Sequence, residues 1–351
     1  MSKAKKVIDE AKEIQNPELD LADKGIASFE EMPGLCEWNR VSVEAADVTK
    51  FGNLFDEVFC SKVEVNMLNI TRLTLSHNKI QVVPPGLANL VNLEILNLFN
   101  NIIEELPTSL SSMPKLRILN VGMNRLGSLP RGFGAFPLLE VLDLTYNNID
   151  ETMLPGNFFM METLRALYLG DNDFEYIPPE IGNLKNLQIL VLRENDLIEL
   201  PKEIGELTRL RELHLQGNRL TVVPPELARV SCPERYRVSV MLASKATLRR
   251  TLLLYAMVIS LMHTAQSRIV DCRLPGRNLD LVSNKSVLRM DLNPWVTPIA
   301  DQLQVGVSHV MDYIRTETYR YVYNRHVAAK GPPPEKYIDK SKKLSRVRQQ
   351  S

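Results

Sequence analysis

Cysteine and histidine are the side chains here that would most directly suggest metal binding or nucleophilic catalysis. No C-x-x-C pair and no zinc-ligand spacing to a histidine is found among the four cysteines, Cys36, Cys60, Cys232 and Cys272. The five histidines are scattered along the chain. Phosphate-binding, dinucleotide-binding, zinc-protease and nucleophile-elbow motifs are absent as well. The sequence therefore predicts a protein that is not an enzyme and that holds neither a cofactor nor a metal.

Composition narrows the class of protein further. The chain has 351 residues, 44% of them hydrophobic and 24% charged, which is typical of a globular protein. Its 42 basic and 42 acidic residues cancel, so no net charge attracts it to nucleic acid or to an anionic membrane. The longest uncharged apolar run, from Thr251 to Gln266, is shorter than the roughly 20 residues that a spanning helix needs. Because its N-terminus lacks the apolar stretch of a secretory signal, we expect a cytoplasmic protein with reduced thiols.

The polar side chain that recurs at a regular spacing is an asparagine. The segment from Leu73 to Asn78 fits the pattern L-x-L-x-x-N, and six further copies follow at intervals of 23 residues, with a single interval of 25. Each asparagine comes where a short strand would end, and its amide can bond backbone groups that would otherwise be buried without a partner. We therefore predict a structural ladder of stacked asparagines, made of Asn78, Asn101, Asn124, Asn147, Asn172, Asn195 and Asn218.

The elements that must position this ladder follow from the same repeat. In Leu-x-Leu, alternate side chains of a strand point into one core, and the residues between them face solvent. A Pro-x-x-[Leu/Ile/Phe] step follows each asparagine, and proline suits the start of a return segment because its φ is preset. This period predicts an α/β leucine-rich repeat solenoid, right-handed, with a parallel concave sheet and a helical C-terminal cap. The two extra residues of the longer repeat, around 150–153, should bulge on the convex side.

A solenoid needs caps, because its end repeats would otherwise expose the core. We predict an N-terminal cap at 1–35, with a degenerate repeat from Leu19 to Lys24 that places lysine in the asparagine position. The regular leucine-rich repeats should span 67–228. The last repeat and a helical cap are predicted at 278–330, and the basic segment 331–351 is expected to be a disordered tail. Within the cap, one helix from about Thr297 to Arg325 should close the core with Ile299, Leu303, Val307, Val310 and Ile314.

Two stretches, 36–66 and 229–277, break the register of the repeats. Both foreign regions include Arg-Val-Ser, at 40–42 and 229–231, and removing the second restores the repeat pattern. We interpret them as insertions outside the repeat pattern, one or both of them translated introns or lineage-specific loops. The alternative for the apolar segment from Leu252 to Met262 is a helix that binds a partner or a membrane.

On the concave sheet, the repeat places large side chains at neighbouring positions. Aromatic anchors surrounded by polar groups are typical of protein interfaces, so we predict that this face binds a protein. The alternative is that these side chains only pack on one another across the sheet. The predicted binding residues are Asn97, Phe99, Asn120, Met123, Asp143, Tyr146, Tyr168, Asp171, Arg193 and Glu194.

Several segments resemble the Ras suppressor protein family beyond the generic repeat. They include Leu75-Ser76-His77-Asn78-Lys79, Gly122-Met123-Asn124-Arg125-Leu126 and Asn293-Pro294-Trp295-Val296-Thr297-Pro298. The resemblance covers nearly everything except the two insertions. It implies a non-enzymatic adaptor that regulates Ras and adhesion signalling and binds a LIM domain of the adaptor PINCH. PINCH would connect it to integrin-linked kinase and parvin at cell–matrix adhesions.

The sequence also gives an expectation for the assembly state and leaves a second class of function open. We expect a monomer within a complex that contains no nucleic acid and inserts no segment stably into a membrane. From the residues alone, a targeting or substrate-receptor subunit of a phosphatase or ubiquitin-ligase complex stays open as the alternative to an adaptor.

Overall fold

The computed structural model describes residues 3–14, 16–32, 70–229, 287–329 and 331–335. These ranges belong to one unit of the chain. The predicted insertions lie outside the described residues, apart from Arg229, and so do the four cysteines and most of the predicted tail.

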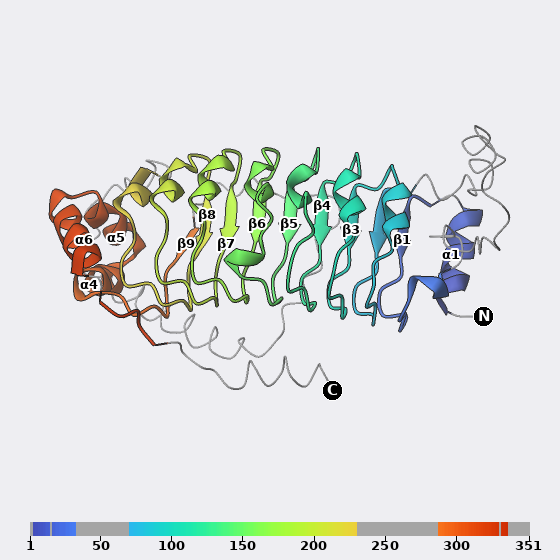
Figure 1. The fold of residues 1–351 in the computed structure, drawn as a ribbon, viewed down its shortest axis with the longest axis horizontal. Helices are drawn as coiled ribbons and strands as arrows, with labels where there is room; N and C mark the ends of the chain where they lie inside the picture. Colours follow the sequence, from blue (N-terminus) through green and yellow to red (C-terminus); the bar gives the residue numbers. More distant parts are fainter. Residues whose placement is uncertain (1–2, 15, 33–69, 230–286, 330, 336–351) are drawn as a thin grey trace, which may run out of the picture. The chain divides into compact units, whose positions relative to one another are not determined.

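Short strands pair in chain order to form one parallel sheet of nine strands (Figure 1). The register places the central leucine of each strand beside that of the next, so that Leu73 pairs with Leu96 and Leu96 with Leu119. These leucines are fully buried, because alternate residues of each strand face one continuous core. The predicted parallel sheet is confirmed. Its strands are β1 (Glu18–Asp20), β2 (Arg72–Thr74), β3 (Ile95–Asn97), β4 (Ile118–Asn120), β5 (Val141–Asp143), β6 (Ala166–Tyr168), β7 (Ile189–Val191), β8 (Glu212–His214) and β9 (Val287–Arg289).

The sheet continues across both long stretches that lie outside the described residues. β1 pairs in register with β2, so the degenerate repeat at 19–24 occupies a repeat position. β9 pairs with β8 in the same way. An eighth copy of the repeat is therefore formed by Leu288, Met290 and Asn293. This copy lies within the range 278–330 that was predicted to hold the last repeat and the cap.

On the convex side, the chain returns through a column of short 3-10 helices. Pro84 and Pro107, both with φ of −71°, directly precede the first two, where a preset φ and a missing N–H cost little. Neighbouring helices of the column contact one another. They are η5 (Pro85–Asn89), η6 (Thr108–Ser112), η7 (Phe133–Ala135), η9 (Phe158–Met160), η10 (Pro179–Asn183), η11 (Lys202–Glu206) and η12 (Pro225–Arg229).

The two extra residues of the longer repeat, predicted to bulge on the convex side, form a turn of their own and leave the column of 3-10 helices continuous. The place of this repeat in the column is held by η9, which contacts η7 and η10. The extra residues form a separate turn, η8 (Glu151–Met153), which precedes the column. The Asp150 carboxylate caps η8 by accepting the Thr152 N–H at 2.8 Å, and the Glu151 carboxylate accepts the Glu175 N–H of the next repeat at 3.1 Å. The two extra residues are therefore accommodated in a turn at which backbone N–H groups bond to nearby carboxylates.

The single helix predicted from Thr297 to Arg325 is three helices, α4 (Thr297–Val305), α5 (Val307–Ile314) and α6 (Glu317–Ala329). Gly306, with φ of 147°, separates the first two, because a helix cannot continue through that backbone conformation. Apolar spacing alone therefore overestimated the helix. Of the predicted core residues, Ile299, Val310 and Ile314 are buried, while Leu303 and Val307 are half-buried against the core.

Polar contacts at the C-terminal end and an apolar contact at the N-terminal end hold the described chain to the repeats. The buried Tyr319 hydroxyl donates to the Val223 carbonyl at 2.5 Å and accepts the Val223 N–H at 3.1 Å. Burial raises the pKa of the Tyr319 phenol, which keeps its proton available for this bond. The Arg219 Nε donates to the Pro334 carbonyl at 2.7 Å, so part of the predicted tail is bound to a repeat. At the other end, Ile8 of α1 (Lys3–Glu13) joins the core.

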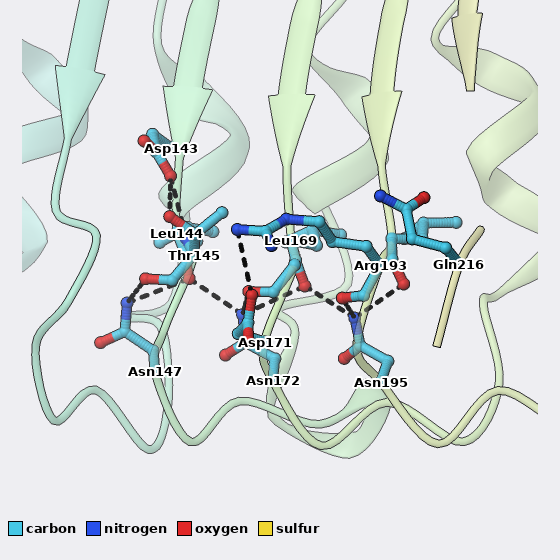
Figure 2. A network of polar contacts seen from close by, with 12 residues as sticks. Asp143, Leu144, Thr145, Asn147, Leu169, Asp171, Asn172, Arg193, Asn195 and Gln216 are labelled. Carbon is cyan, nitrogen blue, oxygen red and sulfur yellow. Dashed lines mark hydrogen bonds and ion pairs between the residues drawn. The ribbon is translucent and has the colours of Figure 1, made fainter. Parts of the chain in front are cut away.

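Each asparagine of the repeat joins two successive repeats through one side chain (Figure 2). The Asn147 Oδ1 accepts the Leu126 N–H of the preceding repeat at 3.0 Å. Its Nδ2 donates to the carbonyl of Val121 in that repeat and to those of Leu144 and Thr145 in its own. The same pattern of bonds recurs from Asn78 to Asn218, and Asn293 repeats it at the end of the sheet.

Replacing Asn147 by alanine should lower the free energy of unfolding by about 1–3 kcal/mol, because buried backbone groups of two repeats lose their partners. Asn148→Ala is the matched control, because the neighbouring Asn148 is exposed. Urea denaturation of both variants measures the difference. Equal stability of the two variants would show that the asparagine amide is not needed.

Candidate protein-binding surface

The residue directly before each repeat asparagine has a left-handed backbone. The angle φ is 54° at Tyr146 and 55° at Met123, values that residues other than glycine rarely adopt. Hydrogen bonds to the next repeat hold them there: the Tyr146 N–H donates to the Gly170 carbonyl at 3.0 Å, and the Met123 N–H to the Thr145 carbonyl at 2.7 Å. The other members of this column are His77, Asn100, Asp171, Glu194, Gly217 and, before Asn293, Leu292.

The predicted binding residues differ in how far solvent reaches them. Tyr146 is the exposed member of the set, with 41% of its surface accessible. Seven others are half-buried and line the neighbouring strand ends: Asn97, Phe99, Met123, Asp143, Tyr168, Arg193 and Glu194.

Two residues predicted to contact a partner are buried instead. Asn120 is 1% exposed, and its Oδ1 accepts the Gly122 N–H at 2.9 Å, so its amide serves its own strand end. Asp171 is 3% exposed and pairs with Arg193. Alternation along a strand predicts the face on which a side chain lies, but not whether a neighbour covers it. Both residues therefore contact neighbouring groups of the chain and are covered by them.

Two glycines outside the predicted binding set shape this surface. Gly122 and Gly170 share a repeat position with Phe99 and Arg193, two residues before the asparagine. A methyl group at Gly122 would stand 3.2 Å from the Phe99 Cδ2, and one at Gly170 would stand 3.0 Å from the Arg193 Cγ. Phe99 therefore lies over Gly122, and Arg193 lies over Gly170. The two glycines belong to the repeats on either side of the one that contains Tyr146. The signal in the sequence is glycine at a repeat position where the other repeats carry a larger side chain.

Arg193 connects three successive repeats. Its guanidinium pairs with the Asp171 carboxylate at 3.2 Å, and its Cζ lies 5.7 Å from the centre of the Tyr146 ring, within the range of a cation–π contact. Figure 2 shows the Arg193 side chain extending from its own strand toward Asp171. Burial opposes the charge, but Asp171, Tyr146 and Glu194 outweigh burial and raise the pKa of Arg193. The guanidinium is therefore permanently charged and held in place.

Asp143 provides a carboxylate at the centre of the same surface. Its Oδ1 accepts the Thr145 N–H at 2.9 Å and the Thr145 hydroxyl at 2.7 Å. Burial raises the pKa of Asp143, and these hydrogen bonds and the Arg193 charge offset that increase only in part. The ionised carboxylate is thus held at a cost to stability.

Aromatic and amide contacts order the surface near β2 and β3. The His77 and Phe99 rings meet edge to face, with their centres 5.6 Å apart. The Asn100 Nδ2 lies 2.8 Å from the His77 Nδ1. Phe99 is thereby fixed between a ring on one side and Gly122 on the other.

Within the described parts of the chain, no cluster of three or more histidine, cysteine, aspartate or glutamate side chains is placed to bind a metal ion. None of the helices in those parts has the length and apolar character needed to cross a membrane.

Comparison with known proteins agrees with the repeat architecture. A leucine-rich repeat model matches residues 68–126, and a leucine-rich repeat region model matches residues 132–245. The described chain is a leucine-rich repeat solenoid. Solved structures of this kind include a leucine-rich repeat protein of Leptospira interrogans, 31% identical over 47% of this chain and 42% of that one, with a TM-score of 0.44. Another is the ectodomain of an Arabidopsis thaliana membrane receptor kinase, 34% identical over 47% and 21% of the two chains, with a TM-score of 0.41.

Part of the solenoid is also similar to curated relatives. A segment of 68 residues, 19% of the chain, is 62% identical to Ras suppressor protein 1 of Mus musculus and of Homo sapiens, and 60% identical to that of Bos taurus. The match covers 24% of each relative, about a quarter of its length. The resemblance seen in the sequence is confirmed over that segment.

Asp143→Asn should stabilise the chain at neutral pH, because asparagine keeps the oxygen that accepts the Thr145 N–H and removes a charge that partial burial disfavours. A pKa raised by folding means that the folded state binds the proton more tightly. The cost of the ionised carboxylate is therefore absent below the unfolded pKa and complete above the folded one. The stability difference between variant and wild type should grow as pH rises from below about 4.

Urea denaturation across this pH range measures the difference, with Asp312→Asn as the control at an exposed position on α5. A difference between Asp143→Asn and wild type that stayed constant, or that shrank with rising pH, would contradict the assignment.

Proposed function

We propose that this chain is a non-enzymatic scaffold that docks a folded protein partner on its concave face. The observation that carries the proposal is the exposed Tyr146 ring, fixed at a left-handed backbone position and flanked by half-buried side chains of neighbouring repeats. We call this set the docking surface: Phe99, Met123, Asp143, Tyr146, Tyr168, Arg193 and Glu194.

The physical character of the docking surface supports a protein ligand. Tyrosine and phenylalanine supply large contact area, and aromatic residues dominate the free energy of many protein interfaces. The backbone of Tyr146 is held by its bond to Gly170, and its ring lies beside Arg193. Because the ring is already ordered, binding costs less conformational entropy than a mobile side chain would lose.

The partner class rests on the similarity to Ras suppressor protein 1. We propose a LIM-domain adaptor, PINCH, linked to integrin-linked kinase and parvin. Under this proposal, the chain regulates Ras and integrin-adhesion signalling in the cytoplasm, at cell–matrix adhesions. The 62% identity over 68 residues favours this partner class over a phosphatase or ubiquitin-ligase complex.

Tyr146→Ala or Phe99→Ala should weaken binding of the zinc-loaded LIM domains of PINCH by about 1–3 kcal/mol, because each removes a preordered anchor. Isothermal titration calorimetry measures the affinity, and thermal unfolding checks that each variant stays folded. The control is Lys185→Ala, which removes only an exposed ion pair with Glu206 and should leave affinity unchanged. Unchanged affinity in both aromatic variants would place the binding site elsewhere.

Zinc should be required by the partner and not by this chain. Removing zinc with a chelator should abolish the complex, because LIM domains depend on structural zinc for folding. The same treatment should leave the circular dichroism and melting temperature of the isolated chain unchanged. Stoichiometric zinc in the purified chain, measured by elemental analysis, would contradict this prediction.

A further inference from the structure

The Arg193 side chain reaches Tyr146 by passing over a repeat that has no side chain in its path. Arg193, Gly170 and Thr145 hold the same position in three successive repeats. A methyl group at Gly170 would stand 3.0 Å from the Arg193 Cγ and 3.4 Å from its Nε, so the aliphatic stem and the Nε both lie close to the glycine backbone. A side chain at position 170 would occupy the space that Arg193 now crosses.

The charged Arg193 guanidinium interacts with groups of the chain itself. Asp171, which is 3% exposed, lies 3.2 Å from one guanidinium nitrogen. The same positive charge attracts the Asp143 carboxylate. The guanidinium carbon also lies 5.7 Å from the centre of the Tyr146 ring, within the range of a cation–π contact. A planar guanidinium can pair with a carboxylate and stack on a ring at the same time, which an ammonium group cannot do.

We infer that Arg193 is a positioning residue of the docking surface, which holds the Tyr146 ring in the orientation that a partner meets, and that Gly170 is the gap that permits it. This inference rests on the proposed function for its consequence in binding. The orientation of the ring is a property of the chain alone. Arg193 thus acts through Tyr146, and its own charge stays with Asp171.

The first test needs no partner. With 3-fluorotyrosine incorporated at position 146, the fluorine resonance reports the surroundings of the ring. Arg193→Lys keeps a charge for Asp171 but loses the planar group, and it should move the resonance toward that of free 3-fluorotyrosine. Gly170→Ala should move it in the same direction with both charges in place. Gly127→Ala is the matched control, since a methyl group there meets nothing within 4 Å. An unmoved resonance in both Arg193→Lys and Gly170→Ala would overturn the inference.

The second test is a double-mutant cycle with the zinc-loaded LIM domains of PINCH. Arg193→Lys should weaken binding about three- to tenfold in the wild-type background, a change on the order of one cation–π contact, because an ammonium group paired with Asp171 cannot also stack on the Tyr146 ring. In the Tyr146→Ala background, the same change should have almost no effect, because no ring remains to be positioned. Equal weakening in both backgrounds would mean that Arg193 contacts the partner directly, and would overturn its positioning role.

The two proposals fail in different ways. If Tyr146→Ala leaves the affinity unchanged, or if the LIM domains do not bind, the docking surface or its proposed partner is wrong, and the fluorine resonance alone decides on Arg193. If Tyr146→Ala weakens binding but shows no coupling with Arg193, the docking surface stands and the positioning role is wrong.

Discussion

The structure depends on satisfying the backbone groups that become buried where each strand ends. One asparagine amide bonds to the carbonyls of its own repeat and to both a carbonyl and an N–H of the repeat before it, as Asn147 does. Because an unpaired buried backbone group costs about as much as a lost hydrogen bond, this side chain couples the repeats as well as ending each strand. The sheet keeps its register across residues 21–71 and 215–286, between β1 and β2 and between β8 and β9.

The same constraint determines what the concave face presents. The turn into the asparagine requires a positive φ at the residue before it, and Met123 and Tyr146 adopt that strained conformation without being glycine. Their N–H bonds to the next repeat compensate for the strain. A large side chain at this position is therefore held rigidly at the end of its strand. The docking surface follows from a repeated backbone geometry, with Gly170 and Arg193 as its local variation.

Strand positions and the asparagine column were predictable because they depend on period alone. The last copy was harder to recognise, because Met290 replaces a leucine and 75 residues separate Asn293 from Asn218. The helix break at Gly306 was not signalled by apolar spacing, which passes through it. The burial of Asn120 and Asp171 depends on which neighbouring rotamers cover them, and a strand pattern carries no information on that. Sequence thus predicts the framework of the site, while contacts between repeats determine its exposed chemistry.

Native-state amide hydrogen exchange tests the central claim most directly. The N–H groups of Ile103, Leu126 and Ile149 donate to asparagine side chains of the following repeat. If these bonds couple the repeats, the three amides should exchange only through cooperative opening, with similar protection that approaches the stability of the whole solenoid. Exchange of these amides as fast as that of the exposed Gly127, in a chain that remains folded, would contradict the account.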